Sequence, residues 1–261
     1  MPSRGDQPGS ARPGEAGGPS EAALAGEDAR TGEAPGAGED ARTGEAPGAG
    51  KAAWPDIAHA YDVVAEDYAA TFGGELRRKP FDRDLLARFA ATVAGRGPVW
   101  DVGCGSAGHI TRYLADRGVQ AAGVDLSPRS VAVARAQQPD LEFRVADMCD
   151  LPADDGSLAG IVAFYSVIHL PRHRIPAALA EFRRALGPGG GLLIAMHGGS
   201  GEIGRDEWLG HSVRVGATLV SMAELTEKLE SAGFALRERH ARDPYEGEAP
   251  TRRLYIWGEA V

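Results

Sequence analysis

Apolar residues first recur along the chain at helical spacing. Ile57, Tyr61 and Tyr68 share one side of a predicted helix that ends before a Gly-Gly pair. A second predicted helix begins at Pro80 and carries another apolar stripe. Together these two helices would form an N-terminal helical cap over residues 54–90.

Further along the chain, short apolar runs alternate with amphipathic segments. Strands are predicted at 99–102, 121–124, 141–145, 159–165, 192–196, 234–240 and 252–258. Helices are predicted at about 107–116, from 128 onward, at 175–186 and at 221–232. This order predicts an α/β fold: a doubly wound, Rossmann-like sheet of seven mostly parallel strands, with helices on both faces and an antiparallel C-terminal strand.

Composition separates the first fifty residues from the rest. They contain 12 Gly and 6 Pro, and their only large apolar residues are Met1 and Leu24. The twelve-residue unit AGEDARTGEAPG occurs at 25–36 and again at 37–48. Because so little apolar surface cannot offset the entropy of ordering, we predict a disordered, acidic Gly/Pro-rich tail over 1–50 and one folded domain over 51–261.

Charge and cysteine content narrow the class of protein. The chain has 28 Lys and Arg against 37 Asp and Glu, a formal net charge of −9. This acidic balance argues against a nucleic-acid partner, and two cysteines provide neither a disulfide framework nor a zinc motif. The sequence shows no apolar run of about 18 residues and no secretory signal, so we expect a cytoplasmic protein without a membrane partner.

A glycine-rich stretch follows the first predicted strand. Gly103, Gly105 and Gly108 satisfy the G-x-G-x-x-G pattern, whose glycines let a nucleotide lie against the backbone. Asp101 favours S-adenosylmethionine over a dinucleotide, because a carboxylate there would repel a pyrophosphate but suits an ammonium and a sulfonium. Asp125 ends the second strand, where it could accept hydrogen bonds from ribose hydroxyls; simple turn chemistry before Ser-Pro is the alternative.

Four motifs, DVGCGSAG, GVDLSP, VADMCDLP and LGPGGGLLIA, occur in that order. Their combination resembles the class I S-adenosylmethionine-dependent methyltransferases, small-molecule and natural-product branch, over about residues 54–258. The resemblance implies that S-adenosyl-L-methionine is the cofactor and that 51–261 is a methyltransferase domain. It also implies these cofactor contacts: Asp101, Gly103 and Gly105 at the methionine part, Tyr61 and Tyr68 over it, Asp125 and Leu126 at the ribose, and Asp147 and Met148 at the adenine.

Two features depart from the family pattern. Ala107 stands where the usual D-x-G-x-G-x-G motif has its last glycine, so the loop is expected to be one residue longer and to end at Gly108. The fourth strand lacks the Asn/Asp-Pro-Pro-aromatic signature of many nucleic-acid amino-methyltransferases, which argues against a base-modifying enzyme.

Candidate catalytic residues follow the fourth and fifth strands, whose carboxyl ends border the crevice of such folds. They are Tyr165, His169 and His197. His169 is the first candidate for a base or for orienting the acceptor, with a capping or packing histidine as the alternative. His197 precedes a Gly-Gly pair and could instead lie in a mobile loop, and Tyr165 could instead cover the cofactor. No metal site is expected.

The segment 198–220 is polar and glycine-rich, which predicts a substrate lid outside the core. Its candidate contact residues are Trp208, His211 and Arg214. We expect Cys104 to be a small packing residue rather than a nucleophile. Arg252 and Arg253 are expected to be solubilising charges at a strand edge, with contact to an acidic substrate as the alternative.

The sequence therefore predicts an S-adenosylmethionine-dependent methyltransferase acting on a small, aromatic or heteroaromatic, natural-product-like acceptor, with the acceptor atom (O, N or C) open. Two alternatives remain: a non-catalytic S-adenosylmethionine-binding subunit, and an NAD(P)-dependent oxidoreductase, for which no hydride-site residues are found. The oligomeric state is not indicated.

Overall fold

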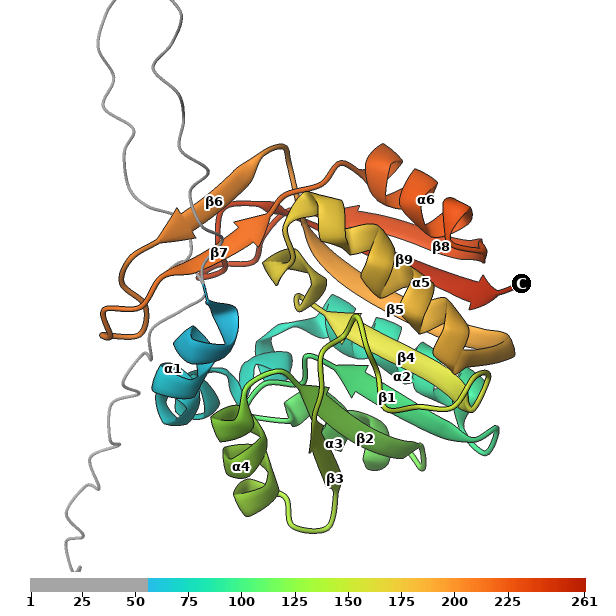
Figure 1. Ribbon diagram of the computed structural model, residues 1–261, viewed down its shortest axis with the longest axis horizontal. Coiled ribbons are helices and arrows are strands. Elements are labelled where there is room, and N and C mark those ends of the chain that lie inside the picture. Colours follow the sequence, from blue (N-terminus) through green and yellow to red (C-terminus); the bar gives the residue numbers. More distant parts are fainter. Residues whose placement is uncertain (1–55) are drawn as a thin grey trace, which may run out of the picture.

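The structure is a computed structural model, and it describes residues 56–261 (Figure 1). The predicted tail over 1–50 and its duplicated unit lie outside the described residues. No helix between residues 56 and 261 has the length and apolar character needed to cross a membrane.

A seven-stranded sheet forms the centre of the domain, in the order β3-β2-β1-β4-β5-β9-β8. Its strands are β1 (Pro98–Val102), β2 (Gln120–Asp125), β3 (Glu142–Val145), β4 (Leu158–Phe164), β5 (Leu186–Gly198), β8 (Phe234–Arg242) and β9 (Arg252–Ala260). Neighbours from β3 to β5 pair in parallel, and β9 is antiparallel to both β5 and β8. The predicted doubly wound sheet with one antiparallel C-terminal strand is therefore confirmed, and β9 lies inside the sheet between β5 and β8.

Helices and short 3-10 turns connect the strands. The helices are α1 (Ile57–Phe72), α2 (Pro80–Val93), α3 (His109–Ala115), α4 (Pro128–Gln137), α5 (Ile175–Ala185) and α6 (Met222–Ser231). The 3-10 turns are η2 (Glu75–Arg78), η3 (Val167–His169) and η4 (Arg172–Arg174). Predicted N-caps are present at α4 and α6, where the hydroxyls of Ser127 and Ser221 accept from the amides of Ser130 and Glu224.

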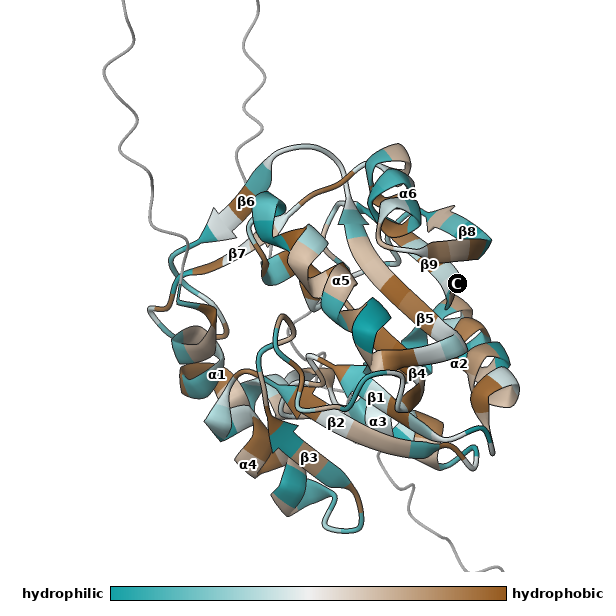
Figure 2. Ribbon diagram, turned by 45° about the vertical axis from the view of Figure 1, so that its right-hand side comes forward, coloured by the Kyte–Doolittle hydropathy of each residue, from teal (hydrophilic) through white to brown (hydrophobic). Residues whose placement is uncertain are grey.

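Two apolar clusters cover the two faces of the sheet. Phe89 of α2 and Leu114 of α3 belong to one cluster, and Phe182 of α5 and Leu225 of α6 belong to the other. Figure 1 accordingly shows α5 in front of the sheet and α2 and α3 behind it. β5 lies between these layers, and Figure 2 shows its mostly apolar middle. The sheet is thus buried on both sides, as parallel strands require.

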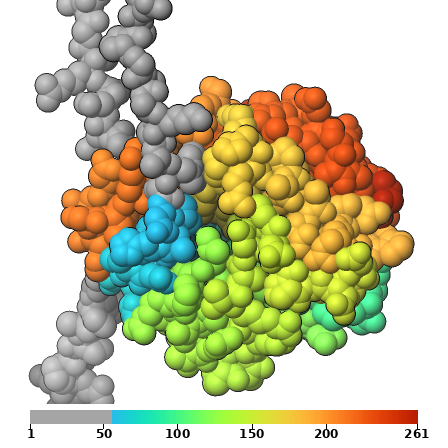
Figure 3. Space-filling model, viewed as in Figure 1, coloured from blue at the N-terminus to red at the C-terminus, as the bar shows by residue number. Residues whose placement is uncertain are grey.

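A small hairpin extends from the carboxyl end of β5. It consists of β6 (Glu202–Arg205) and β7 (Val215–Thr218), and it lies beside α1 at one end of the molecule (Figures 1 and 3). Trp208 and Val215 are buried against Tyr61 and Val64 of α1. The expectation that 198–220 lies outside the core was wrong, because much of its second half packs into a satellite core with α1.

Two element boundaries also differ from the predictions. The Gly-rich run before residue 192 was expected to be a tight turn, but β5 begins at Leu186 and pairs with β4 across an irregularity. Gly189 has a φ of +69°, which lets the strand bend there without a break. α3 begins at His109, because Gly108 adopts a left-handed conformation and forms its N-cap.

Candidate functional site

The glycine loop between β1 and α3 brings the backbone against two other segments. Gly103 has a φ of +77°, and a Cβ there would lie 2.2 Å from the Cβ of Ser166. Gly105 has a φ of +62°, and a Cβ there would lie 3.1 Å from Cε1 of Tyr68. At both positions the positive φ and the close neighbours therefore require glycine. The two glycines leave an open cradle at the carboxyl end of β1.

A cavity of about 740 Å³, including its open mouth, lies over this cradle. Ten residues predicted for the site line it: Tyr61, Tyr68, Gly103, Gly105, Asp125, Leu126, Asp147, Met148, Tyr165 and His169. Its mixture of aromatic, apolar and carboxylate side chains is typical of a small-molecule or nucleotide site. Ser166, which follows Tyr165 and was a further acceptor-side candidate, also lines the cavity, whereas the sequence did not single out Val102, Phe164 and Arg174 for the site. Their types are ordinary for strand ends and helices, so only the fold brings them together.

Asp125 ends β2 at the wall of the cavity. One carboxylate oxygen accepts a hydrogen bond from the Gly105 amide at 2.9 Å, and the other accepts from the Ser127 amide at 2.9 Å. Burial raises the pKa of this carboxyl, while the backbone donors oppose the rise. The turn role is thus present, and it is compatible with the predicted ligand role, because each carboxylate oxygen can accept more than one hydrogen bond.

Asp147 and Met148 form the next part of the wall, just after β3. The Asp147 carboxylate accepts a hydrogen bond from the Cys149 amide at 2.8 Å, and Arg174 lies 3.7 Å from its other oxygen. These contacts fix the carboxylate at the cavity without filling it. The pair thus presents a carboxylate and a short backbone turn to a ligand.

Asp101 lies beneath the cradle and is not among the cavity-lining residues. It is 1% exposed, and its carboxylate accepts a hydrogen bond from the Thr111 hydroxyl at 2.7 Å. Desolvation raises its pKa to about 6, against the opposing hydrogen bond from Thr111. Asp101 is therefore not part of the cavity wall, contrary to a direct contact with a ligand in this cavity.

His169 ends η3 and lines the cavity. Its Nδ1 lies 2.7 Å from the carbonyl oxygen of Gly216 in β7, and its Nε2 lies 2.8 Å from the Tyr61 hydroxyl. Because a carbonyl only accepts, Nδ1 carries the proton and Nε2 accepts from Tyr61. Desolvation lowers the pKa of His169 to about 4, so the imidazole is neutral at neutral pH.

His197 occupies a different position from the one expected. It lies within β5, is 1% exposed, and is not among the residues that line the cavity. Its Nδ1 lies 2.7 Å from the Thr251 hydroxyl and 3.0 Å from Arg253. Desolvation, followed by the Arg253 charge, lowers its pKa to about 3. A mobile-loop position is therefore wrong, and the site suits a neutral, structural imidazole.

Tyr165 follows β4 and connects the cavity to the interior. Its φ of +53° is unusual for a residue with a side chain, and its ring lies 5.3 Å from that of His197. The hydroxyl lies 2.7 Å from the Tyr255 hydroxyl and 3.4 Å from an Asp82 carboxylate oxygen.

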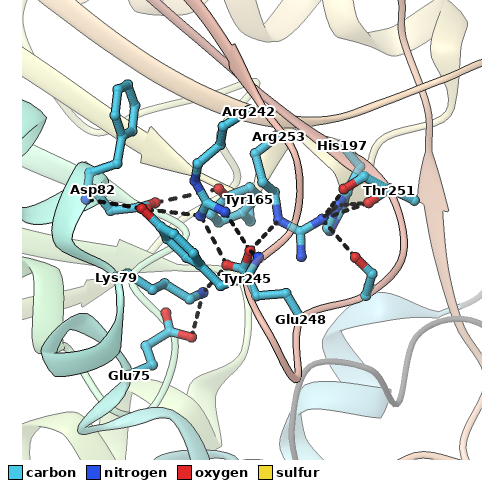
Figure 4. A network of polar contacts seen from close by, with 12 residues as sticks. Glu75, Lys79, Asp82, Tyr165, His197, Arg242, Tyr245, Glu248, Thr251 and Arg253 are labelled. Carbon is cyan, nitrogen blue, oxygen red and sulfur yellow. Dashed lines mark hydrogen bonds and ion pairs between the residues drawn. The ribbon is translucent and has the colours of Figure 1, made fainter.

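These contacts belong to a buried polar network that the sequence did not reveal (Figure 4). Arg242 binds Asp82 at 2.9 Å and Glu248 at 2.5 Å, and Lys79 binds Glu75 at 2.9 Å. Arg253 is fully buried beside Glu248, so its expected place as an exposed edge charge was wrong. The network joins residues from η2, α2, β8, β9 and the loop after β8, and no local spacing could indicate it.

The longer glycine loop has a structural use. The Ser106 hydroxyl donates to the Ala65 carbonyl of α1 at 2.5 Å, and Ala107 is buried. Cys104 is buried against Phe143, and burial raises the pKa of its thiol, as expected for a packing residue. Ser106 thus attaches the loop to α1.

The lid candidates have three different positions. Trp208 packs on Tyr61 with a ring distance of 5.1 Å. His211 lies 2.7 Å from Asp67 of α1, whereas Arg214 pairs with the exposed Asp206. None of the three is among the cavity-lining residues. The hairpin contacts the cavity wall through α1, through His169 and through Leu170, whose carbonyl accepts from the Thr218 hydroxyl at 2.7 Å. Residues 56–261 include no cluster of three or more His, Cys, Asp or Glu that could hold a metal ion.

Comparison with known proteins agrees with this geometry. A family model described as a methyltransferase domain matches residues 99–190. A probable S-adenosylmethionine-dependent methyltransferase of Mycolicibacterium smegmatis is 33% identical over 157 residues, covering 59% of this chain and 58% of that protein. The O-methyltransferase resE of Aspergillus sclerotiorum is 29% identical over 181 residues, covering 66% and 67% of the two chains. The chain thus spans less than two thirds of the length of the first relative and about two thirds of the second.

A solved structure supports the same architecture. The CcbJ methyltransferase from Streptomyces caelestis superposes with a TM-score of 0.58 at 19% identity, covering 77% of this chain and 98% of that one. At this identity the likeness concerns the fold alone. Residues 99–190 thus match a methyltransferase domain, and the fold, the motifs and the sequence relatives are similar to those of the class I S-adenosylmethionine-dependent methyltransferases, which supports S-adenosylmethionine as the cofactor.

Proposed function

We propose that this protein transfers a methyl group from S-adenosylmethionine to a small aromatic or heteroaromatic acceptor of natural-product type. The observation that carries the proposal is the glycine cradle at the end of β1, which opens into a cavity walled by Asp125, Asp147 and the α1 tyrosines. The relatives named as O-methyltransferases support a small-molecule acceptor.

The cavity residues suit the parts of the cofactor. Gly103 and Gly105 leave space where a side chain would clash, so their backbone can lie against the methionine part. Asp125, with Leu126 beside it, would hold the ribose. Two backbone amides fix its carboxylate at the cavity wall, where its oxygens can accept further hydrogen bonds from hydroxyls. Asp147 and Met148 would hold the adenine. The buried charge of Asp101 favours the cofactor's ammonium group from below the loop.

The reacting end of the cavity is aromatic. Tyr61, Tyr68, Phe164 and Tyr165 line it together with His169. Aromatic walls bind flat apolar rings well and exclude water, which favours an in-line displacement. α1 closes one side of this end, and the β6–β7 hairpin supports α1, so we assign 198–220 the role of a lid support.

The three catalytic candidates then have separate roles. His169, neutral and fixed by Gly216, would orient the acceptor with Tyr61. Tyr165 would contact the acceptor from the opposite side. His197 would support Tyr165 by ring packing, since its low pKa and burial oppose a role as base. The bound cofactor supplies an electrophilic methyl group on a sulfonium.

Calorimetry with S-adenosylmethionine, S-adenosylhomocysteine and NAD tests the proposal. We expect the first two ligands to bind and NAD not to bind. Asp125→Ala should weaken S-adenosylmethionine binding by about tenfold or more, because a ribose contact and the position of Gly105 are lost together. Asp116→Ala, at an exposed position at the end of α3, is the matched control and should leave the affinity unchanged.

Binding and turnover separate the alternatives. Preferential binding of NAD would refute the proposal, and unchanged affinity in Asp125→Ala would refute the ribose assignment. Tight S-adenosylmethionine binding, with no methyl transfer to any of a broad panel of hydroxylated and nitrogenous aromatics, would favour the non-catalytic subunit.

A further inference from the structure

Three polar groups form a continuous chain from the cavity wall into the interior. The Tyr165 hydroxyl lies 2.7 Å from the Tyr255 hydroxyl, and the Tyr255 hydroxyl lies 2.9 Å from Oδ1 of Asp82. Tyr165 lines the cavity, whereas Tyr255 in β9 and Asp82 in α2 are fully buried. Buried polar chains of this kind are costly unless every member is satisfied.

The donor and acceptor rules give this chain a direction. An ionised carboxylate only accepts, so the Tyr255 proton points to Asp82. The Tyr255 oxygen also accepts from Nε of Arg242 at 3.0 Å, and its remaining lone pair accepts the proton of Tyr165. The proton of Tyr165 is thereby directed inward, and its oxygen keeps the capacity to accept a hydrogen bond. Every hydrogen bond in the chain points from the cavity to Asp82.

The surroundings of Asp82 allow its charge to change. Arg242 contacts Asp82 at 2.9 Å, and it also holds both carboxylate oxygens of Glu248, at 2.5 and 3.0 Å. If Asp82 were neutralised, the guanidinium would still have a paired carboxylate. Figure 4 shows the Arg242 guanidinium joined to both Asp82 and Glu248. Desolvation raises the pKa of Asp82 despite the nearby Arg242 and Lys79 charges, which is consistent with a group that can take up a proton.

We propose that Tyr165, Tyr255 and Asp82 form a proton relay that serves acceptors bearing an O–H or N–H group, with Tyr165 as the residue that contacts the acceptor. This inference rests on the proposed function and narrows it: the acceptor atom carries a proton that can be donated to the Tyr165 oxygen. A ring carbon without such a proton would not use the relay.

Protons and charges balance across the relay. As the acceptor atom gains a methyl group, its proton passes to the Tyr165 oxygen, the Tyr165 proton passes to the Tyr255 oxygen, and the Tyr255 proton passes to Oδ1 of Asp82. The acceptor has exchanged a proton for a methyl group, both tyrosines remain neutral, and Asp82 becomes a neutral acid. The charge lost at Asp82 matches the positive charge lost when the sulfonium becomes a thioether. Asp82 later returns its proton to solvent.

Other charged groups surround the relay without interrupting it. Lys79 lies 5.5 Å from the Tyr165 ring centre and pairs with Glu75 and Glu248. Arg253 lies 5.6 Å from the same ring centre. His197 stacks beside it and is held neutral by its low pKa. Cations near the Tyr165 ring stabilise electron density on the phenol as the proton moves.

The first test measures binding without turnover. In the presence of S-adenosylhomocysteine, phenol should bind about tenfold more tightly than toluene, because its hydroxyl donates to the Tyr165 oxygen. Tyr165→Phe should abolish this preference. Tyr113→Phe, whose hydroxyl contacts the Arg83 carbonyl at the surface, is the matched control and should keep it. A phenol preference that survives in Tyr165→Phe would overturn the proposal.

The second test measures methyl transfer to a series of ring-substituted phenols from phenol to 4-nitrophenol. Asp82→Asn and Tyr255→Phe should each lower kcat for phenol about 100-fold, the usual contribution of a proton acceptor. The defect should shrink for 4-nitrophenol, which is already largely ionised near neutral pH and needs no relay. Asp84→Asn, on the exposed side of α2, is the control and should behave as wild type across the series.

A merely structural role gives a different pattern. It would lower kcat by the same factor for every phenol, and that result would overturn the relay. Tyr255→Phe keeps the ion pair between Asp82 and Arg242, so it remains informative if Asp82→Asn fails to fold. If S-adenosylmethionine binds but wild type methylates no phenol or indole, the relay is refuted and the cofactor assignment is retained. If the cofactor does not bind, the proposed function itself is refuted.

Discussion

At the residue scale, the environment of each titratable group decides what it can do in the cavity. His169 and His197 are both buried and hydrogen-bonded, and desolvation lowers their pKa values to about 4 and about 3. Asp101 is shifted in the opposite sense, to about 6, by the same desolvation. Burial favours the neutral form in each case, so the site resists uncompensated charge.

The low pKa of His169 predicts a dependence of stability on pH. Its folded pKa of about 4 lies below the ordinary histidine value of 6.5, so unfolding takes up a proton as the pH falls. This contribution to the free energy of unfolding is fully present above pH 6.5 and is lost as the pH falls toward 4. At pH 5 the loss amounts to about 2 kcal/mol. Urea unfolding at pH 7 and pH 5 should show a smaller acid loss in His169→Gln than in wild type.

His59→Gln provides the control for this measurement, because His59 is exposed near the start of α1. It should show the same acid loss as wild type. An acid loss in His169→Gln equal to that of wild type would contradict the lowered pKa.

Local sequence signals were informative wherever one residue type is required by backbone geometry. Gly103 and Gly105 have positive φ and no room for a Cβ, so their spacing predicted the cradle. Arg253 and Asp82 carry no such local signal, because their burial depends on partners 5 to more than 100 residues away, such as Glu248 and Arg242. The sequence therefore indicated most of the cavity wall and missed the polar network behind Tyr165.

At the element scale, α1 and the β6–β7 hairpin behave as one unit. Trp208 contacts the rings of both Tyr61 and Tyr68, at 5.1 and 5.7 Å. Gly216 of β7 fixes the tautomer of His169. The hairpin thus determines the position of the cap and the hydrogen-bonding pattern of His169. Polar composition hid this role, because its buried residues alternate with glycines and charges.

Trp208→Ala should separate the hairpin from α1. Loss of a buried indole costs about 3 kcal/mol or more, and this loss should fall on the local packing of the hairpin and α1. We expect faster proteolysis within 202–213 and weaker S-adenosylmethionine binding, since Tyr61 and Tyr68 lose their support. Arg214→Ala, whose side chain is 57% exposed, should leave both unchanged. Proteolysis as slow as in wild type would show that Trp208 does not hold the hairpin in place.

At the scale of the whole molecule, the two halves of the sheet carry different parts of the candidate site. β1, β2 and β3 carry the cradle, Asp125 and the residues that follow β3, whereas β5, β8 and β9 carry His197 and the polar network. β4 lies between them and places Tyr165 where the halves meet. The alternation of strands and helices was enough to predict this sheet, because parallel strands joined by helices allow few topologies. It did not reveal the β6–β7 sheet, whose strands are only four residues long.

The reactivity of the two cysteines can report opening of the domain in solution. Cys104 is 5% exposed in the glycine loop after β1, and Cys149 is partly exposed next to Met148. In Cys149→Ser, a thiol reagent should modify Cys104 only after the domain opens. S-adenosylmethionine at 100 times its dissociation constant should slow that modification about 100-fold, because it binds only the closed state. A modification rate unaffected by the cofactor would show that Cys104 becomes accessible without opening the site.

The place of β9 has a consequence for how the chain assembles during synthesis. β5 and β8 have no contact with each other in the sheet until residues 252–260 lie between them. Until that segment emerges from the ribosome, the mostly apolar β5 presents an open edge, which is a template for unwanted pairing with other chains. The half that carries the cradle can form early, but the wall that holds Tyr255 and Arg253 is made last. A nascent chain would therefore pass through a stage in which the strands of the cradle are complete while one edge of β5 is still unpaired.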